Sequence, residues 1–244
     1  MGLVIALAVA GCSSSGSSAT GAVMKAVSAT LGSGTVRVQA TSVTPTASGS
    51  DTSKATGSYD LAAHEGTYSV DTGALLGTVQ ALATESTLYI HLPAALAATL
   101  TGGKAWATAD LQHPPTIPGI GNLPSVAGGA DPTRALIGLQ EGMTGAKKMG
   151  VAAGVTQYQA TVNLTRASSP LAASEMTLLG GSAETDEIYV GTDGRIQRLV
   201  QSVRLSGGGV PEVVTTDFSD YGQPVTIVIP PPSQTVDAAK LLGS

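Results

Sequence analysis

The stretch EIYVGTDGRIQRLVQSVRL, residues 187–205, decides the fold of this chain. Apolar and polar side chains alternate on both sides of Asp193-Gly194, a dipeptide typical of a two-residue β-hairpin turn. Alternation over this length indicates strands with one buried face and one solvated face. The stretch therefore predicts two antiparallel strands joined by a tight turn.

Strand-like patterns of the same kind occur along most of the chain. The segment TVRVQAT, residues 35–41, places Val36 and Val38 on one face of a half-buried strand and polar residues on the other. Further strands are predicted at residues 57–61, 66–71, 77–82, 87–92, 106–111, 150–164 with a turn at Gly154, 213–221 and 225–229. The polar residues 42–54 and the Pro- and Gly-rich residues 112–130 predict loops.

Short helices are expected between these strands. Their patterns lie at residues 22–31, 93–100, 132–140 and 170–179, and from residue 236 onward. About nine or ten strands with a few short helices predict an α+β fold, in which a large antiparallel sheet packs against helices.

The composition excludes several classes of protein. Twelve Lys and Arg stand against 17 Asp and Glu, which gives a formal net charge of −5. Nucleic-acid binding rewards clustered basic residues, so we expect no nucleic-acid partner. A single cysteine leaves no internal disulfide and no site built from several cysteines. A chain of 244 residues is long enough for one domain with a good core.

The single cysteine, Cys12, follows an unbroken apolar run at residues 3–10. The run has the length of a signal-peptide core and is too short to span a membrane. Small residues directly precede the cysteine in LAVAGC, as in a bacterial lipobox, although no Lys or Arg precedes the run. We expect residues 1–11 to be a lipoprotein signal peptide and Cys12 to carry the acyl chains. Residues 12–21 would form a flexible tether; the alternative is a free thiol buried in an apolar helix.

No catalytic or cofactor motif stands out in the sequence. There is no Gly-x-Ser-x-Gly, no phosphate-binding Gly-rich loop and no His-Glu-x-x-His. The histidines His64, His91 and His113 lie in three different segments, where each is expected to be an exposed turn, strand or loop residue. We therefore expect a protein that is not an enzyme and that holds no cofactor or metal.

Three polar or aromatic features have both a functional and a structural interpretation. The acidic residues Glu184, Asp186 and Glu187 either bind a cation weakly or form a solvated strand entrance. The pair Lys147-Lys148 either contacts anionic head groups or is simply solvated. The only tryptophan, Trp106, either lines a pocket or fills the core or its rim.

Several segments together carry a family resemblance. They are TVRVQAT (35–41), STLYIHLPAAL (86–96), GGKAWATADL (102–111), DPTRALIGL (131–139), GVAAGVTQYQATVNL (150–164), IYVGTDGRIQRL (188–199) and DFSDYGQPVTIVIPP (217–231). In order and spacing they resemble the actinobacterial LppX/LprAFG lipoprotein family, whose domain is similar to the LolA/LolB fold. The resemblance covers about residues 22–242, and residues 22–244 are taken as one domain.

The resemblance implies a strongly curved antiparallel sheet over helices, with an apolar cavity that holds the acyl chains of lipids. It also implies an extracytoplasmic protein that is lipid-anchored in the cell membrane and that binds or transfers lipids or acylated glycolipids. No residue of the family is carried over except Cys12.

The residues themselves suggest which side chains face such a cavity. The apolar positions of the first strands are Val36, Val38, Tyr68, Val70, Leu88 and Ile90. The helices available to cover them are short and rich in Ala, so an apolar void can remain between the layers. The alternative is a packed aliphatic core in a structural or regulatory envelope lipoprotein with a protein partner.

Overall fold

The computed structural model describes residues 15–46, 49–71, 77–110, 132–166, 183–203 and 210–241. Cys12 and the predicted signal peptide, the predicted loop 112–130 and the predicted helix 170–179 lie outside the described residues.

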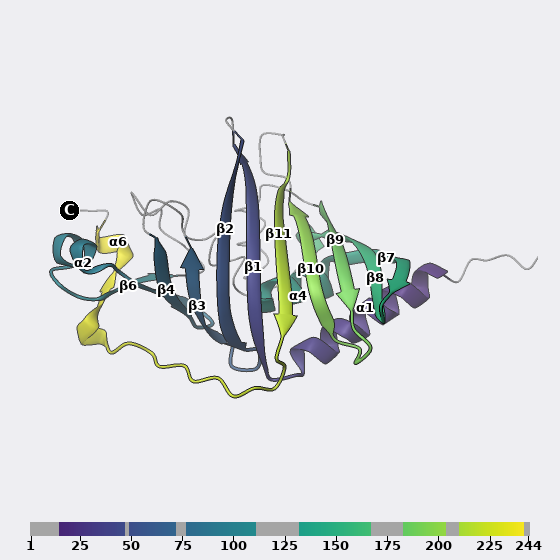
Figure 1. Ribbon diagram of the computed structural model, residues 1–244, viewed down its shortest axis with the longest axis horizontal. Coiled ribbons are helices and arrows are strands. Elements are labelled where there is room, and N and C mark those ends of the chain that lie inside the picture. Colours follow the sequence, from purple (N-terminus) through teal and green to yellow (C-terminus); the bar gives the residue numbers. More distant parts are fainter. Residues whose placement is uncertain are drawn as a thin grey trace, which may run out of the picture.

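One large open sheet forms the body of the molecule (Figure 1). Within the described ranges it has twelve strands in the order β12-β6-β5-β4-β3-β2-β1-β11-β10-β9-β8-β7. Their bounds are β1 Thr35–Thr46, β2 Gly49–Asp60, β3 Glu65–Asp71, β4 Thr78–Ala83, β5 Thr87–His91, β6 Trp106–Asp110, β7 Met143–Ala152, β8 Val155–Asn163, β9 Ala183–Val190, β10 Ile196–Val203, β11 Glu212–Ser219 and β12 Thr235–Asp237. Every neighbouring pair is antiparallel except β12 with β6. The predicted α+β class with a large antiparallel sheet is confirmed.

Four α-helices are described beside the sheet. They are α1 Ser15–Leu31, α2 Ala94–Leu100, α4 Pro132–Gly142 and α6 Ala238–Leu241, and two single 3-10 turns lie at Leu164–Arg166 and Pro232–Gln234. Helices α1 and α4 contact each other, and both pack on β7 and β8, while α1 also reaches β10. Figure 1 shows α2 and α6 at the opposite end of the sheet, where α6 contacts β6. No described helix is both long enough and apolar enough to cross a membrane.

Helix α1 is longer than the sequence pattern predicts. It begins at Ser15 rather than at residue 22, so residues 15–21 are helical and do not belong to a flexible tether. Its buried positions Val23, Ala26 and Val27 recur at the spacing of one helical face. Thr30 fixes the end of the helix on the sheet, since its Oγ1 accepts a hydrogen bond from the backbone N–H of Ile196 at 3.0 Å.

The predicted loop at residues 42–54 is wrong, because β1 and β2 pair along almost their whole length. Their register runs from Thr35 opposite Asp60 to Thr46 opposite Gly49. Toward the tip of this hairpin the side chains are exposed or half-buried on both faces. Solvent on both faces removes the apolar alternation by which a strand is recognised in a sequence, although Thr favours strands.

The hairpin at Asp193-Gly194 is confirmed, but its loop is longer than two residues. Val190 pairs with Ile196, and the backbone N–H of Gly191 donates to the carbonyl of Arg195 at 2.9 Å. Five residues, 191–195, therefore connect β9 and β10.

The predicted strand at residues 225–229 is also wrong. The chain after β11 runs as an extended segment along one end of the sheet (Figure 1) and pairs with no described strand. Both neighbours of β11 in the sheet, β1 and β10, are already in place. Prolines at Pro224 and Pro230 also remove backbone donors on either side. The predicted terminal helix is replaced at its start by β12, which contains Val236.

Candidate functional site

The candidate lipid-contacting residues lie on one face of the sheet, the face that packs toward the helices. Strand pairing places Val38, Gly57, Tyr68, Ala81, Ile90 and Ala107 side by side across β1 to β6. A second row contains Val36, Tyr59, Gly66, Ala83, Leu88 and Ala109. A third, shorter row contains Ala40, Ala55, Val70 and Val79. These three rows are called the inner rows below.

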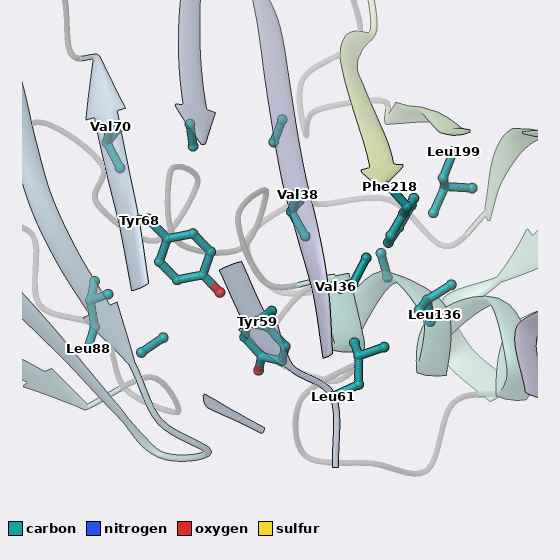
Figure 2. Close-up of a cluster of buried hydrophobic side chains, with 14 of the residues drawn as sticks. Val36, Val38, Tyr59, Leu61, Tyr68, Val70, Leu88, Leu136, Leu199 and Phe218 are labelled. Atoms are coloured by element: carbon teal, nitrogen blue, oxygen red, sulfur yellow. The ribbon is translucent and has the colours of Figure 1, made fainter. Parts of the chain in front are cut away.

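The structure brings all six predicted residues into one buried cluster. Val36, Val38, Tyr68, Val70, Leu88 and Ile90 are each at most 4% exposed. Figure 2 shows Tyr68, Val70 and Leu88 on one side of the cluster and Val36 and Val38 on the other. The prediction that these six share a face holds because side chains two apart on a strand point the same way.

Large and small side chains alternate along the first inner row, where Val38 is followed by Gly57, Tyr68 by Ala81, and Ile90 by Ala107. In the second row the large residues are offset, since Tyr59 on β2 lies opposite Gly66 on β3. The inner face therefore offers an apolar contact surface to a flexible alkyl chain, which needs no specific polar partner.

Two glycines in these rows are required by close contacts. A Cβ on Gly66 would lie 2.2 Å from Cδ2 of Tyr59 and 2.8 Å from the hydroxyl of Tyr68. A Cβ on Gly57 would lie 2.1 Å from the backbone oxygen of Thr67. The rings of Tyr59 and Tyr68, with centroids 6.2 Å apart, therefore lie over glycine backbone (Figure 2).

The described helices cover the two halves of the sheet unequally. The principal contacts of α1 and α4 with strands are made with β7, β8 and β10. Leu136 of α4 is fully buried and belongs to the same hydrophobic cluster as Val36 and Phe218 (Figure 2). Within the described residues, the inner rows of β2 to β5 thus lie beyond the main area covered by α1 and α4.

Sequence reasoning missed several members of this cluster. Tyr59, Leu61, Leu136, Leu199 and Phe218 are buried with the six predicted residues. Tyr59 lies in a predicted strand, and its register opposite Val36 identifies it as an inner residue. Phe218 pairs with Val38 in the same way. Only strand pairing, which the sequence pattern does not supply, reveals these two.

The opposite face of the sheet carries a polar groove of about 590 Å³. It is lined in part by ion pairs between Arg195 and Asp193 at 2.7 Å and between Arg198 and Asp217 at 2.6 Å. The guanidinium of Arg195 also lies 4.3 Å from the ring centre of Tyr221, which donates a hydrogen bond to the carbonyl of Ile196.

The pKa values of four groups in and beside this groove are shifted by their surroundings. The backbone N–H of Arg195 and its guanidinium lower the pKa of Asp193, while the hydrogen bond to Asp217 raises the pKa of Arg198. Burial raises the pKa of Tyr221, and the carboxylate of Glu187 raises that of Tyr189. All four shifts move the pKa of the group away from 7, so they favour the charged forms of Asp193 and Arg198 and the neutral forms of Tyr189 and Tyr221.

The structure separates the other candidate residues. His64 lies in the turn after β2 with a φ of 55°, and His91 is exposed on β5 with its ring 4.9 Å from that of Trp106. His113 lies outside the described residues. No group of three metal-ligating side chains occurs in the described part of the chain.

The acidic candidates do not form one cluster. Asp186 is fully buried, whereas Glu187 accepts a hydrogen bond from the Tyr189 hydroxyl at 2.8 Å. The two carboxylates therefore lie on opposite faces of β9. Nothing is described of the side chain of Glu184.

Comparison with solved structures identifies the fold. The chain resembles the lipoprotein LppX from Mycobacterium tuberculosis with a TM-score of 0.54 and 13% sequence identity, over 87% of this chain and 99% of LppX. It also matches LprF from Mycobacterium bovis with a TM-score of 0.45 and 16% identity, over 88% of this chain and 97% of LprF. A LolA superfamily protein from Nitrosomonas europaea matches with a TM-score of 0.38 and 10% identity, over 85% and 94%.

The likeness to LppX is one of fold. No protein-family model matches the chain, and no curated protein matches its sequence. The predicted resemblance to LppX is confirmed as a likeness of fold.

Proposed function

From the fold that this chain shares with LppX, we propose that it is an extracytoplasmic lipoprotein that binds or transfers lipids, including acylated glycolipids. Cys12 is the proposed site of acylation, and residues 1–11 are the proposed signal peptide. The ligand's acyl chains are proposed to lie along the inner rows. The observation that carries the proposal is the continuous apolar inner face of β2 to β5, which lies beyond the main area covered by α1 and α4.

The burial of the six residues adds a condition. Because they are at most 4% exposed, an acyl chain reaches them only by displacing the groups that now pack against them. Uptake then includes a conformational step, and the free energy of that step lowers the apparent affinity. The same low exposure favours the second candidate function, a structural or regulatory lipoprotein with a packed core.

The experiment that separates these two functions measures lipid bound per folded molecule. The chain is incubated with phospholipid or glycolipid in mixed micelles, and the detergent is then removed. Native mass spectrometry measures the mass of the folded protein and of any bound lipid. We expect a lipid adduct for the wild type. A rise in melting temperature with lipid concentration should accompany it, since a ligand that binds only the folded state stabilises that state.

A pair of variants locates the site. Val70→Trp enlarges an inner-row residue, and Val200→Trp makes the same change on β10 at a half-buried position outside these rows. We expect Val70→Trp to lower lipid occupancy and Val200→Trp to leave it unchanged. In a packed core, the larger side chain costs typically about 1–3 kcal/mol of stability and has no effect on occupancy. Absence of any adduct with the wild type would refute the carrier function without reference to a variant.

A further inference from the structure

The hairpin formed by β7 and β8 carries an exposed surface that the lipid-binding proposal does not use. Met149 is 49% exposed and Val151 is 59% exposed, next to the exposed lysines Lys147 and Lys148. These four residues are called the hairpin patch. In the part of the chain that the structure describes, they combine two of the five exposed large apolar side chains with the only pair of adjacent cations.

The charge of the hairpin patch differs from that of the whole protein. The formal net charge of the chain is −5, yet residues 143–158 contain two lysines and no Asp or Glu. Neither Lys147 nor Lys148 forms an ion pair within the described residues. An anionic surface therefore repels most of this protein and attracts the hairpin patch.

The hairpin patch lies at the end of the sheet from which the chain leads toward Cys12. β7 is an edge strand, and the backbone N–H of Ala146 donates a hydrogen bond to Oγ1 of Thr20 in α1 at 3.1 Å. Figure 1 shows the first turns of α1 at this edge. The helix begins at Ser15, three residues after Cys12, so the two positions are at most about 11 Å apart along the chain.

We propose that the hairpin patch docks onto an anionic lipid bilayer and sets the orientation of the anchored protein. The inference rests on the proposed acylation of Cys12, which would hold this edge at the membrane. Lys147 and Lys148 project from opposite faces of the edge strand β7, so a bilayer that meets this edge faces both ammonium groups. The side chains of Met149 and Val151 enter the interface beside them. A tether of three residues brings the hairpin patch to the bilayer without unfolding α1.

A structural explanation accounts for only part of the hairpin patch. Lysines and bulges on an edge strand prevent pairing with another sheet, and β7 has two irregularities, at 143–145 and 148–150. Protection of the edge does not call for Met149 and Val151 to be exposed, because apolar side chains promote the association that the lysines oppose. Membrane docking accounts for the cations and the apolar side chains together.

The test uses the two ends of the sheet as probe and control. The full 244-residue chain is coupled through its only thiol, that of Cys12, to a maleimide lipid in vesicles. The vesicles contain brominated lipid, which quenches tryptophan at bilayer depth. The native Trp106, on β6 at the far end of the sheet, reports contact of that end. Met149→Trp adds a second tryptophan within the hairpin patch.

We expect no quenching of the wild type and quenching of close to half the emission in Met149→Trp on anionic vesicles. Zwitterionic vesicles should give much less. Replacing both lysines by Gln should weaken docking roughly 30-fold, since each lysine near an anionic surface contributes about 1 kcal/mol. The control Lys54→Gln/Lys240→Gln makes the same change in charge elsewhere and should leave quenching unchanged.

Three results would overturn the proposal. The first is quenching of Trp106 in the wild type. The second is quenching of Met149→Trp that depends neither on lipid charge nor on the two lysines. The third is a Met149→Trp chain that forms dimers and whose added tryptophan is not quenched. Chemical coupling at Cys12 needs neither natural acylation nor lipid uptake. Failure of the proposed function therefore leaves this test valid, and failure of docking leaves the proposed function standing.

Discussion

The contact between Gly57 and the backbone of β3 allows a stability prediction worked from geometry. In Gly57→Ala, the new Cβ would lie 2.1 Å from the Thr67 carbonyl oxygen, more than 1 Å inside ordinary contact. Backbone cannot rotate away as a flexible side chain does, so β2 and β3 must separate locally. Gly145→Ala is the matched control, because a Cβ on Gly145 in β7 meets nothing within 4 Å.

The expected cost combines three effects. Weakening two ladder hydrogen bonds costs about 2 kcal/mol, and overpacking beside the Tyr68 ring costs about 2 kcal/mol more. Alanine also lowers the conformational entropy of the unfolded chain, which stabilises the folded state by about 0.7 kcal/mol. The free energy of unfolding should thus fall by about 3 kcal/mol, which for a chain of this size lowers the melting temperature by roughly 6–12 °C.

Thermal and urea unfolding, followed by circular dichroism, measure this difference. Gly145→Ala should stay within about 0.5 kcal/mol of the wild type, because Gly145 is only half-buried and a Cβ there meets nothing within 4 Å. If the two alanine variants unfold at the same temperature, β2 and β3 do not approach as closely as the structure places them. The close packing of Tyr59 and Tyr68 over glycine backbone on the inner face would then lose its geometric basis.

Three further predictions concern the helix end, the polar groove and the anchor. Thr30→Val removes the acceptor of the Ile196 amide and should cost about 1–3 kcal/mol in urea unfolding, whereas Thr99→Val removes an exposed hydroxyl within α2 and should cost little. The pKa of Asp193 is lowered in the folded state, so its contribution is present above the unfolded pKa and lost as the pH falls through the folded pKa. Stability of the wild type relative to Asp193→Asn should therefore decline on acidification, by well under 1 kcal/mol because the pair is partly exposed. Cys12→Ser should move the protein from the membrane fraction to the soluble fraction without changing its melting temperature, and retention in the membrane fraction would place the anchor elsewhere.

The sequence predicts those strands that have one buried face and one solvent-exposed face. Val36 and Val38 are buried in β1, and the turn at Asp193-Gly194 joins two paired strands. The alternation of apolar and polar residues is lost where both faces of a strand are open to solvent, as at residues 42–54. The prediction fails again at residues 225–229, where the preceding strand, β11, already has a neighbour on each side.

The candidate site follows the same logic. Alternation alone places six residues on the inner face, since parity along a strand is a local property. The close approach of Tyr59 to Gly66 depends on which residues of β2 and β3 stand opposite each other. That register is set by the whole β1–β4 meander, so no short stretch of sequence contains it.

The two proposals together determine where cargo would lie relative to the membrane. The hairpin patch is on β7, and the candidate lipid residues are on β1, β3 and β5, which are five, seven and nine strands away in the sheet. At about 4.8 Å per strand these separations are about 24, 34 and 43 Å along the sheet. A protein docked through its β7 edge then holds an acyl chain away from the bilayer that anchors it, and its β6 end points outward. Loading from that bilayer would require the patch to release, whereas delivery to a second membrane or a protein partner would not. Patch variants that abolish docking should therefore accelerate lipid exchange with the anchoring bilayer and leave exchange with separate acceptor vesicles unchanged.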